Sequence, residues 1–381
     1  MYTRLLTKTS TRVLKLFPGE PDSQIVTSLE QVDLENGPVY QCLSYTWGAS
    51  DNTSDISVCN TSFAVRKNLY DFLRRFRDAT ETRSLWVDAL CISQTDLDEK
   101  AHQVIMIGRI FQQAARVLVW VGESADNSNM LFQPTADAPL WRKALGAQPG
   151  SKAIRQRVTA WNAFLSRPYW TRTWIVQEII CAKSIVVHCG ADHADWETLI
   201  RPRVHEVFEY LFDGISLSSM KVHKVVGLDA GCLFGNTTRN IARLVYARRG
   251  HWQDRYTAAP GHQIMGRISQ FASNESFDRR DKIYSMLSLE PEEAFRNAIG
   301  VDYEISVEEL CVRVLSALER HGWNGRIVAS QMVQIFSMSR REVRELLNHL
   351  TFNHWATSTE SISYLERYTI DGFLVAPMIE P

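Results

Sequence analysis

A helical pattern between residues 97 and 115, which runs without a break into a buried strand, constrains the fold of this chain most. Its small and apolar residues recur at the i, i+3, i+4, i+7 spacing of one helix face: Val104, Ile107, Gly108, Phe111, Ala114 and Ala115. Before the helix, residues 85–87 predict a short strand that ends at Asp88, and after it RVLVWVG (116–122) predicts a second one. This strand–helix–strand order predicts parallel pairing, because parallel strands need a long crossover connection.

The neighbouring segments extend the same alternation. They are a strand in VYQCLSYTWG (39–48), a hairpin over 56–65 with Asn60-Thr61-Ser62 at its tip, a helix over 66–79, further helices near 153–165 and 172–182, and a strand over 184–190. We therefore expect an α/β fold with a doubly wound, mainly parallel sheet flanked by helices on both faces. In such sheets ligands bind beyond the carboxyl ends of the strands, which here brings Ser44, Tyr45, Asp88 and the loop after Val121 to one edge.

The chain changes character after about residue 200, where helical patterns dominate. Amphipathic segments are expected at 207–212, 240–249, 278–289 and 306–320. The expected organisation is an N-terminal lead-in (1–38), an α/β domain (39–200) and a mostly helical C-terminal region (201–381).

Composition narrows the function classes. The chain has 381 residues and a net charge of −1, so its overall charge gives no reason to bind nucleic acid or an anionic membrane. Its seven cysteines are scattered without a CxxC pair, which favours free thiols over a disulfide framework or a structural zinc site. We expect no membrane span and no secretory leader, and a cytoplasmic location.

The stretch RPYWTRTWIVQEI (167–179) places Glu178 in a helix that we expect to be largely buried. A buried carboxylate is costly unless it is paired or used in chemistry. The structural interpretation is an ion pair with Arg172 or another arginine, and the functional interpretation is a catalytic acid group.

Three blocks in this order resemble the fungal heterokaryon-incompatibility (HET) domain: CLSYTWG (42–48), the segment from Leu85 to Gly122, and RPYWTRTWIVQEI. RDKIYSMLSL followed by VDYEISVEEL resembles the segment that usually follows that domain, whereas Ser93 stands where asparagine is usual. The resemblance implies a role in nonself recognition and programmed cell death. It also implies a distant similarity to TIR domains.

In enzymatic TIR domains the glutamate of the corresponding helix cleaves NAD⁺, and the matching residue here is Glu178. The resemblance thus implies an NAD⁺ glycohydrolase with Glu178 as catalytic residue and NAD⁺ as substrate, without a cofactor or metal. Nicotinamide leaves as a neutral group, and one carboxylate near the ribose stabilises the oxocarbenium-like transition state. The residues expected to bind the substrate are Ser44, Tyr45, Trp47, Asp88, Arg172 and Trp174.

Other interpretations stay open at this point. The same surfaces fit a non-enzymatic module that self-associates or binds a protein partner, and a third possibility is a divergent member with a role in secondary metabolism. Asp88 also fits a cap of the loop that follows it, and Glu99 a helix-capping residue beside Asp96. Cys91 with His102, the HCGADH segment (188–193) and the basic segments at 74–77 and 243–250 are better explained as packing or surface residues.

Overall fold

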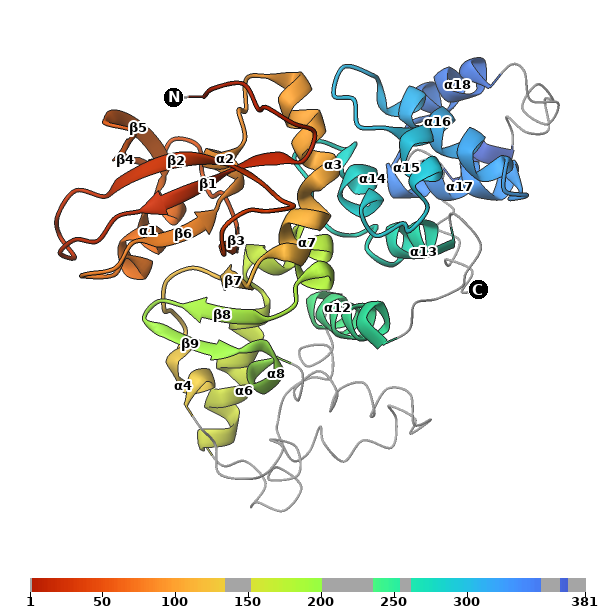
Figure 1. Cartoon of the computed structure of the whole chain (residues 1–381). Helices are drawn as coiled ribbons and strands as arrows, with labels where there is room; N and C mark the ends of the chain where they lie inside the picture. The colour runs from red at the N-terminus through yellow and green to blue at the C-terminus, as the bar shows by residue number, and fades with distance from the viewer. Residues whose placement is uncertain (1, 134–151, 201–235, 254–261, 351–363, 369–381) are drawn as a thin grey trace. The chain divides into compact units, whose positions relative to one another are not determined.

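The computed structural model of the chain describes residues 2–133, 152–200, 236–253, 262–350 and 364–368 (Figure 1). The chain divides into two compact units. The first comprises Met1–Gln103 and Ile107–Arg255, and the second comprises Val104–Met106 and Tyr256–Pro381. Each unit is described separately below.

The first unit is built on a nine-stranded sheet in the order β5-β4-β2-β1-β6-β3-β7-β8-β9 (Figure 1). Its strands are β1 (Ser10–Leu16), β2 (Val26–Asp33), β3 (Gln41–Tyr45), β4 (Thr53–Val58), β5 (Thr61–Arg66), β6 (Arg83–Trp86), β7 (Arg116–Trp120), β8 (Ile185–Cys189) and β9 (Asp192–Asp195). The β2-β4, β6-β3, β3-β7 and β7-β8 pairs are parallel, whereas β1 pairs antiparallel with β2 and β6, β4 with β5, and β8 with β9. The α/β class is therefore confirmed, but the sheet is mixed rather than mainly parallel.

The four central strands form a doubly wound core. In chain order β3 is the first of them, β6 the second, β7 the third and β8 the fourth, and they lie side by side as β6-β3-β7-β8. The chain moves from β3 to β6 in one direction and then crosses back over β3 to reach β7. The point of reversal therefore lies between β3 and β7, and this is where open α/β sheets bind their ligands.

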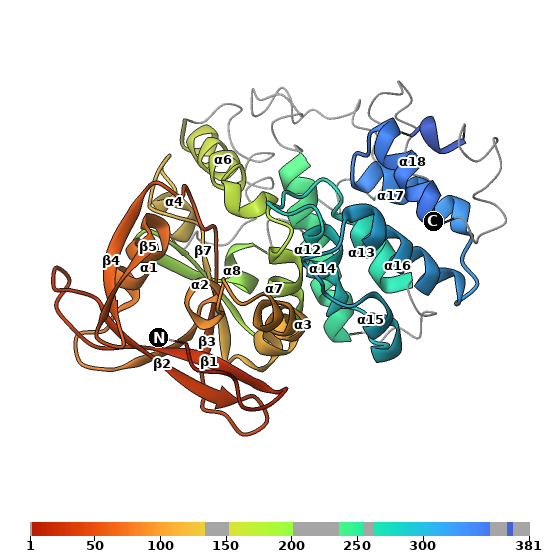
Figure 2. The same ribbon diagram turned by 90° about the horizontal axis from the view of Figure 1, so that it is seen from above.

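Helices cover both faces of this core (Figure 2). On one face is α1 (Lys67–Phe76), whose Phe72 ring lies 5.8 Å from that of Trp120. On the other face are α3 (Leu97–Gln113) and α7 (Ile175–Cys181). Cys42 on β3 donates to the Ile110 carbonyl of α3, and Ser44 on the same strand contacts α7. The unit also contains α6 (Lys152–Leu165) and four short elements: α2 (Asp88–Cys91), α4 (Asn129–Phe132), the 3₁₀ turn η1 (Pro168–Thr171) and α8 (Trp196–Leu199).

Two strands come from the expected N-terminal lead-in. β1 inserts between β2 and β6 and joins the parallel core to the outer strands. The expected hairpin is present as β4 and β5, but its turn is Cys59-Asn60, one residue before the predicted tip. Both turn residues have positive φ, 50° and 63°, as tight hairpin turns of the primed type require.

The helix α12 (Asn236–Gln253) belongs to the first unit although it follows the expected α/β domain in sequence. It packs against α7 (Figure 1). The second unit contains α13 (His262–Gln270), α14 (Asp281–Leu287), α15 (Glu293–Ile299), α16 (Val307–Glu319), α17 (Gly325–Ile335) and α18 (Arg340–His349). The helices expected near 240–249, 278–289 and 306–320 are thus present, and the segment 207–212 lies outside the described residues. Within the described ranges no helix is long and apolar enough to cross a membrane.

Candidate functional site

Glu178 and Ser44 meet on the α7 face of the sheet. Ser44 is the penultimate residue of β3, is 1% exposed, and donates its hydroxyl proton to Oε2 of Glu178. The Tyr169 hydroxyl, which comes from η1, lies 2.7 Å from the Ser44 Oγ. Three polar groups from β3, η1 and α7 are therefore joined in one buried chain of hydrogen bonds.

Glu178 is buried as the sequence predicts, with an exposed fraction of 6%, and every residue of α7 is buried. Arg172, the residue that follows η1, places Nη1 3.6 Å from Oε2 of Glu178. Burial raises the pKa of Glu178, and the Arg172 charge and the Ser44 hydrogen bond act in the opposite direction. The ion pair expected of a structural carboxylate is thus present, but it does not offset the cost of burial.

A second carboxylate, Asp88, lies at the carboxyl end of β6. Its Oδ2 accepts from Nε1 of Trp47 at 2.8 Å, and its Oδ1 accepts from the amide of Ala89 at 2.7 Å. Desolvation raises the pKa of Asp88, and the positive charge of Arg172 is the largest influence that lowers it. Asp88 therefore does cap the loop that follows it, as one interpretation of the sequence predicts. Its hydrogen bond with Trp47 is an additional interaction that capping does not explain.

One cation serves both carboxylates, because Arg172 lowers the pKa of Glu178 and of Asp88. Tyr45 belongs to the same cluster: it is buried, burial raises the pKa of its hydroxyl, and Asp88 adds to that effect. The structure thus brings together Ser44, Tyr45, Trp47, Asp88, Arg172 and Glu178. Trp174 is tied to them through the backbone, since its carbonyl accepts from the Glu178 amide at 3.4 Å.

Two residues that the sequence did not single out hold the loop carrying Trp47. Arg66 donates to the Gly48 carbonyl at 2.6 Å, and its guanidinium lies 5.1 Å from the centre of the Trp47 ring. Asn68 donates to the Thr46 carbonyl at 2.5 Å and accepts from Nε1 of Trp120 at 2.7 Å. The loop is therefore fixed on both sides of Trp47 from the start of α1. In the sequence, only the run TWG (46–48) indicated a loop at this position.

Comparison with known proteins agrees with this arrangement of blocks. The family described as "Heterokaryon incompatibility protein (HET)" matches residues 40–178, from the residue before β3 to the candidate carboxylate. Residues 40–178 are thus similar to the HET domain and are referred to below by that name. Heterokaryon incompatibility protein 6, OR allele, from Neurospora crassa is 31% identical over 196 residues, an alignment that covers 40% of this chain and 29% of the relative. The chain thus spans less than a third of that protein. No solved structure matches it.

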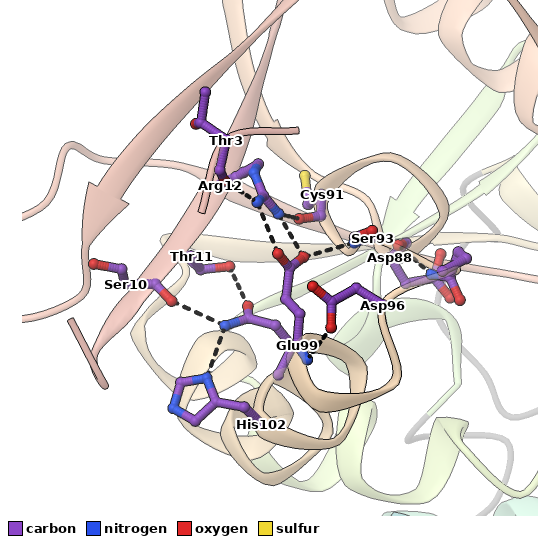
Figure 3. Close-up of polar contacts among 12 residues, drawn as sticks. Thr3, Ser10, Thr11, Arg12, Asp88, Cys91, Ser93, Asp96, Glu99 and His102 are labelled. Atoms are coloured by element: carbon purple, nitrogen blue, oxygen red, sulfur yellow. Dashed lines mark hydrogen bonds and ion pairs between the residues drawn. The ribbon is translucent and has the colours of Figure 1, made fainter. Parts of the chain in front are cut away.

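A buried ion pair anchors the HET domain to the strand that precedes it (Figure 3). Arg12 of β1, 2% exposed, binds Glu99 of α3 through two bonds of 2.6 and 2.8 Å. Glu99 also accepts from the Ser93 amide at 2.7 Å. The expectation for Glu99 is therefore corrected: Asp96 caps the helix by accepting from the Glu99 amide, whereas the Glu99 side chain pairs with arginine.

Cys91 and the histidines of the HCGADH segment (188–193), which were considered as site residues, have structural explanations. Cys91 is buried, burial raises the pKa of its thiol to about 12, and its thiol contacts backbone groups of residues 85 and 87. His188 and His193 stack on each other at 5.4 Å, and burial lowers the pKa of His188 to about 4. Among the described residues no group of three potential ligands could hold a metal ion.

The first arginine of the third block, Arg167, organises the loop after β7. Its Nη1 donates to the carbonyls of Val121 at 3.1 Å and Glu123 at 2.9 Å. This loop follows a strand at the reversal point of the HET domain core. Arg167 therefore shapes the same sheet edge that Arg66 and Asn68 shape from α1.

Proposed function

We propose that this protein acts in nonself recognition between fungal individuals and signals through its HET domain toward programmed cell death. The HET domain itself and the likeness to an incompatibility protein of Neurospora crassa support this role. For the chemistry we propose hydrolysis of the N-glycosidic bond of NAD⁺, with Glu178 as the catalytic residue.

One observation carries the chemical proposal: a buried glutamate is held against the carboxyl end of β3, beside the point where the strand order reverses. Glu178 gains no stability from burial, because burial raises its pKa and its arginine partner lies at 3.6 Å. Retaining a group that is unfavourable for folding is typical of functional sites. We propose the TIR-like relationship on the same observation, because Ser44 of the CLSY strand is hydrogen-bonded to Glu178 of the QEI helix.

The reaction suits the groups at the site. The bond between the ribose C1′ and the nicotinamide nitrogen breaks, and its electron pair neutralises the positive ring, so no general acid is required. The Glu178 carboxylate stabilises the cationic ribose that develops, water adds at C1′, and its proton passes to solvent. Trp47 offers an aromatic wall, and Arg172 offers a cation for the pyrophosphate, while Asp88 fixes the Trp47 indole.

Nicotinamide release from NAD⁺ by the full chain tests this proposal. The wild type, Glu178→Gln and the control Glu30→Gln are compared at low and high protein concentration, since self-association is one expected mode of activation. Glu30 is an exposed carboxylate of β2 that pairs with Lys15 at 3.1 Å, far in sequence from the site. We expect release by the wild type and the control and a loss of at least about 100-fold in Glu178→Gln.

No release from folded wild-type protein at any concentration would overturn the enzymatic proposal. The HET domain would then act as a module that binds a partner or a second copy of itself. Equal release by the wild type and Glu178→Gln would keep the activity but remove Glu178 from its mechanism.

A further inference from the structure

The hydrogen-bond chain that ends on Glu178 begins at Tyr169, a residue that the sequence did not single out. Tyr169 is 1% exposed and comes from η1, whereas Ser44 comes from β3, 125 residues earlier. Within the part of the chain that the structure describes, the Ser44 Oγ is the one hydrogen-bond partner of the Tyr169 hydroxyl. The Ser44 Oγ in turn contacts only Tyr169 and Oε2 of Glu178 among these residues.

The direction of the protons in this chain depends on the charge of Glu178. When Glu178 is ionised it only accepts, so Ser44 donates to it and Tyr169 donates to Ser44. Both hydroxyl protons then have an acceptor. When Glu178 is protonated and donates to Ser44, one hydroxyl proton loses its acceptor: the Tyr169 proton if Ser44 turns to donate to Tyr169, or the Ser44 proton if Tyr169 still donates to Ser44. A buried donor without an acceptor is costly.

We propose that Tyr169 is a positioning residue for Glu178: its hydroxyl fixes the direction of the Ser44 hydroxyl and so keeps a proton aimed at Oε2. Burial raises the pKa of Tyr169 far above its usual range, so this hydroxyl stays a donor at every physiological pH. Tyr169 thereby favours the charged carboxylate that the proposed reaction needs, although it does not touch Glu178. For its catalytic meaning this inference rests on the proposed function.

Other ionisable groups act on Glu178 as well. Arg172 favours its charged form, while Asp88 on α2 disfavours it. The Cys42 thiol of β3 and the Tyr169 hydroxyl are neutral, because burial raises the pKa of both. None of these groups replaces the Ser44 hydrogen bond, so the contribution of Tyr169 passes through Ser44 alone.

The test measures the pKa of Glu178 directly, without activity. The full chain is labelled with ¹³C at glutamate carboxyl carbons and titrated by NMR, and Glu178→Gln identifies the signal. We expect Tyr169→Phe to raise the pKa of Glu178 by about half to one unit, the size of one hydrogen bond between neutral groups. Phenylalanine keeps the ring contact with Trp170 at 4.9 Å, so the packing is preserved.

Two further variants test whether Tyr169 acts on Glu178 through Ser44. Ser44→Ala is expected to raise the pKa of Glu178 more than Tyr169→Phe does, and the double variant is expected to match Ser44→Ala, because Tyr169 acts only through Ser44. The control is Tyr40→Phe, which removes a buried hydroxyl that donates at 2.8 Å to the Ile110 carbonyl and takes no part in the Tyr169–Ser44–Glu178 chain. It should leave the pKa of Glu178 unchanged.

The positioning role is overturned if Tyr169→Phe leaves the pKa of Glu178 at the wild-type value. It is also overturned if Tyr169→Phe shifts this pKa by the same amount in the wild type and in Ser44→Ala. If the protein releases nicotinamide, the acid limb of its pH–rate profile should move upward in Tyr169→Phe by the same amount. If it releases none, the NMR titration still decides the inference, so its failure and that of the proposed function remain distinct.

Discussion

Arg248 of α12 donates to the carbonyl of Ile179, the residue that follows Glu178, at 3.0 Å. It also donates to the carbonyls of Ala182 and Lys183. These carbonyls stand at the C-terminal end of α7, where a helix has unsatisfied acceptors and favours positive charge. A helix outside the matched region 40–178 therefore caps the helix that carries the candidate carboxylate. The basic segment at 243–250 thus includes a structural arginine, not only a solvated face.

Replacing Arg248 by methionine should destabilise the first unit by roughly 1–3 kcal/mol, because it leaves the end of α7 without its donors. Denaturant-induced unfolding measures the change, and Arg249→Met, at an exposed neighbour, is the matched control. Equal stabilities of the two variants would show that water replaces the cap.

The Arg12–Glu99 pair should respond in a different way to single and double changes. Removing one partner leaves a buried charge, so Glu99→Leu or Arg12→Met should each cost about 3–5 kcal/mol. The double variant, which combines Arg12→Met with Glu99→Leu, leaves no buried charge and should recover part of that loss. Urea denaturation of the three variants checks this, and fully additive losses would argue against a coupled pair.

Much of the doubly wound core could be predicted from the sequence, because it depends on local periodicity. The helix expected over 97–115 is observed at Leu97–Gln113, and the strand after it at Arg116–Trp120. The strand β1 was missed because Arg12 interrupts its apolar pattern, and that arginine is buried with Glu99 and the carbonyls of Thr3 and Cys91 as its partners. Partners that are 87 residues apart leave no periodic signal.

The candidate site shows the same limit. The strand-end rule placed Ser44, Tyr45 and Asp88 at one edge, and the structure joins them to Glu178 and Arg172. Arg66, Asn68 and Tyr169 were missed, since each acts by a hydrogen bond to a residue far along the chain. Polar residues at the start of a helix or in a 3₁₀ turn are common, so their type alone does not mark them.

Asn68 joins the ends of the two strands at the reversal point, so its removal should weaken both. Asn68→Ala leaves the Trp120 indole N–H and the Thr46 carbonyl without this partner, and we expect a loss of roughly 1–3 kcal/mol. Lys67→Ala, which removes a part-buried ion pair with Asp71 one turn along the same helix, should change stability by less than about 1 kcal/mol. Guanidinium denaturation of both variants measures the difference, and similar losses would contradict a specific role for Asn68.

Glu178→Gln should become more stable relative to the wild type as the pH rises. Burial raises the pKa of Glu178 in the folded state above its value of 4.5 in the unfolded chain. Between these two values the folded state holds a proton that the unfolded state has released, so wild-type stability falls as the pH rises through this window. Glutamine stays neutral and does not contribute to that fall. Each unit of difference between the two pKa values is worth about 1.4 kcal/mol.

Thermal and urea unfolding of the wild type and Glu178→Gln between pH 4 and 8 measures this difference. Contributions from other carboxylates cancel in the comparison, and Glu30→Gln, which removes an exposed carboxylate of β2, is the control. A stability difference that does not change with pH would show that the pKa of Glu178 is not raised. A difference that grows in favour of the wild type would show that the Arg172 ion pair outweighs burial, and Glu178 would then be a structural residue of α7.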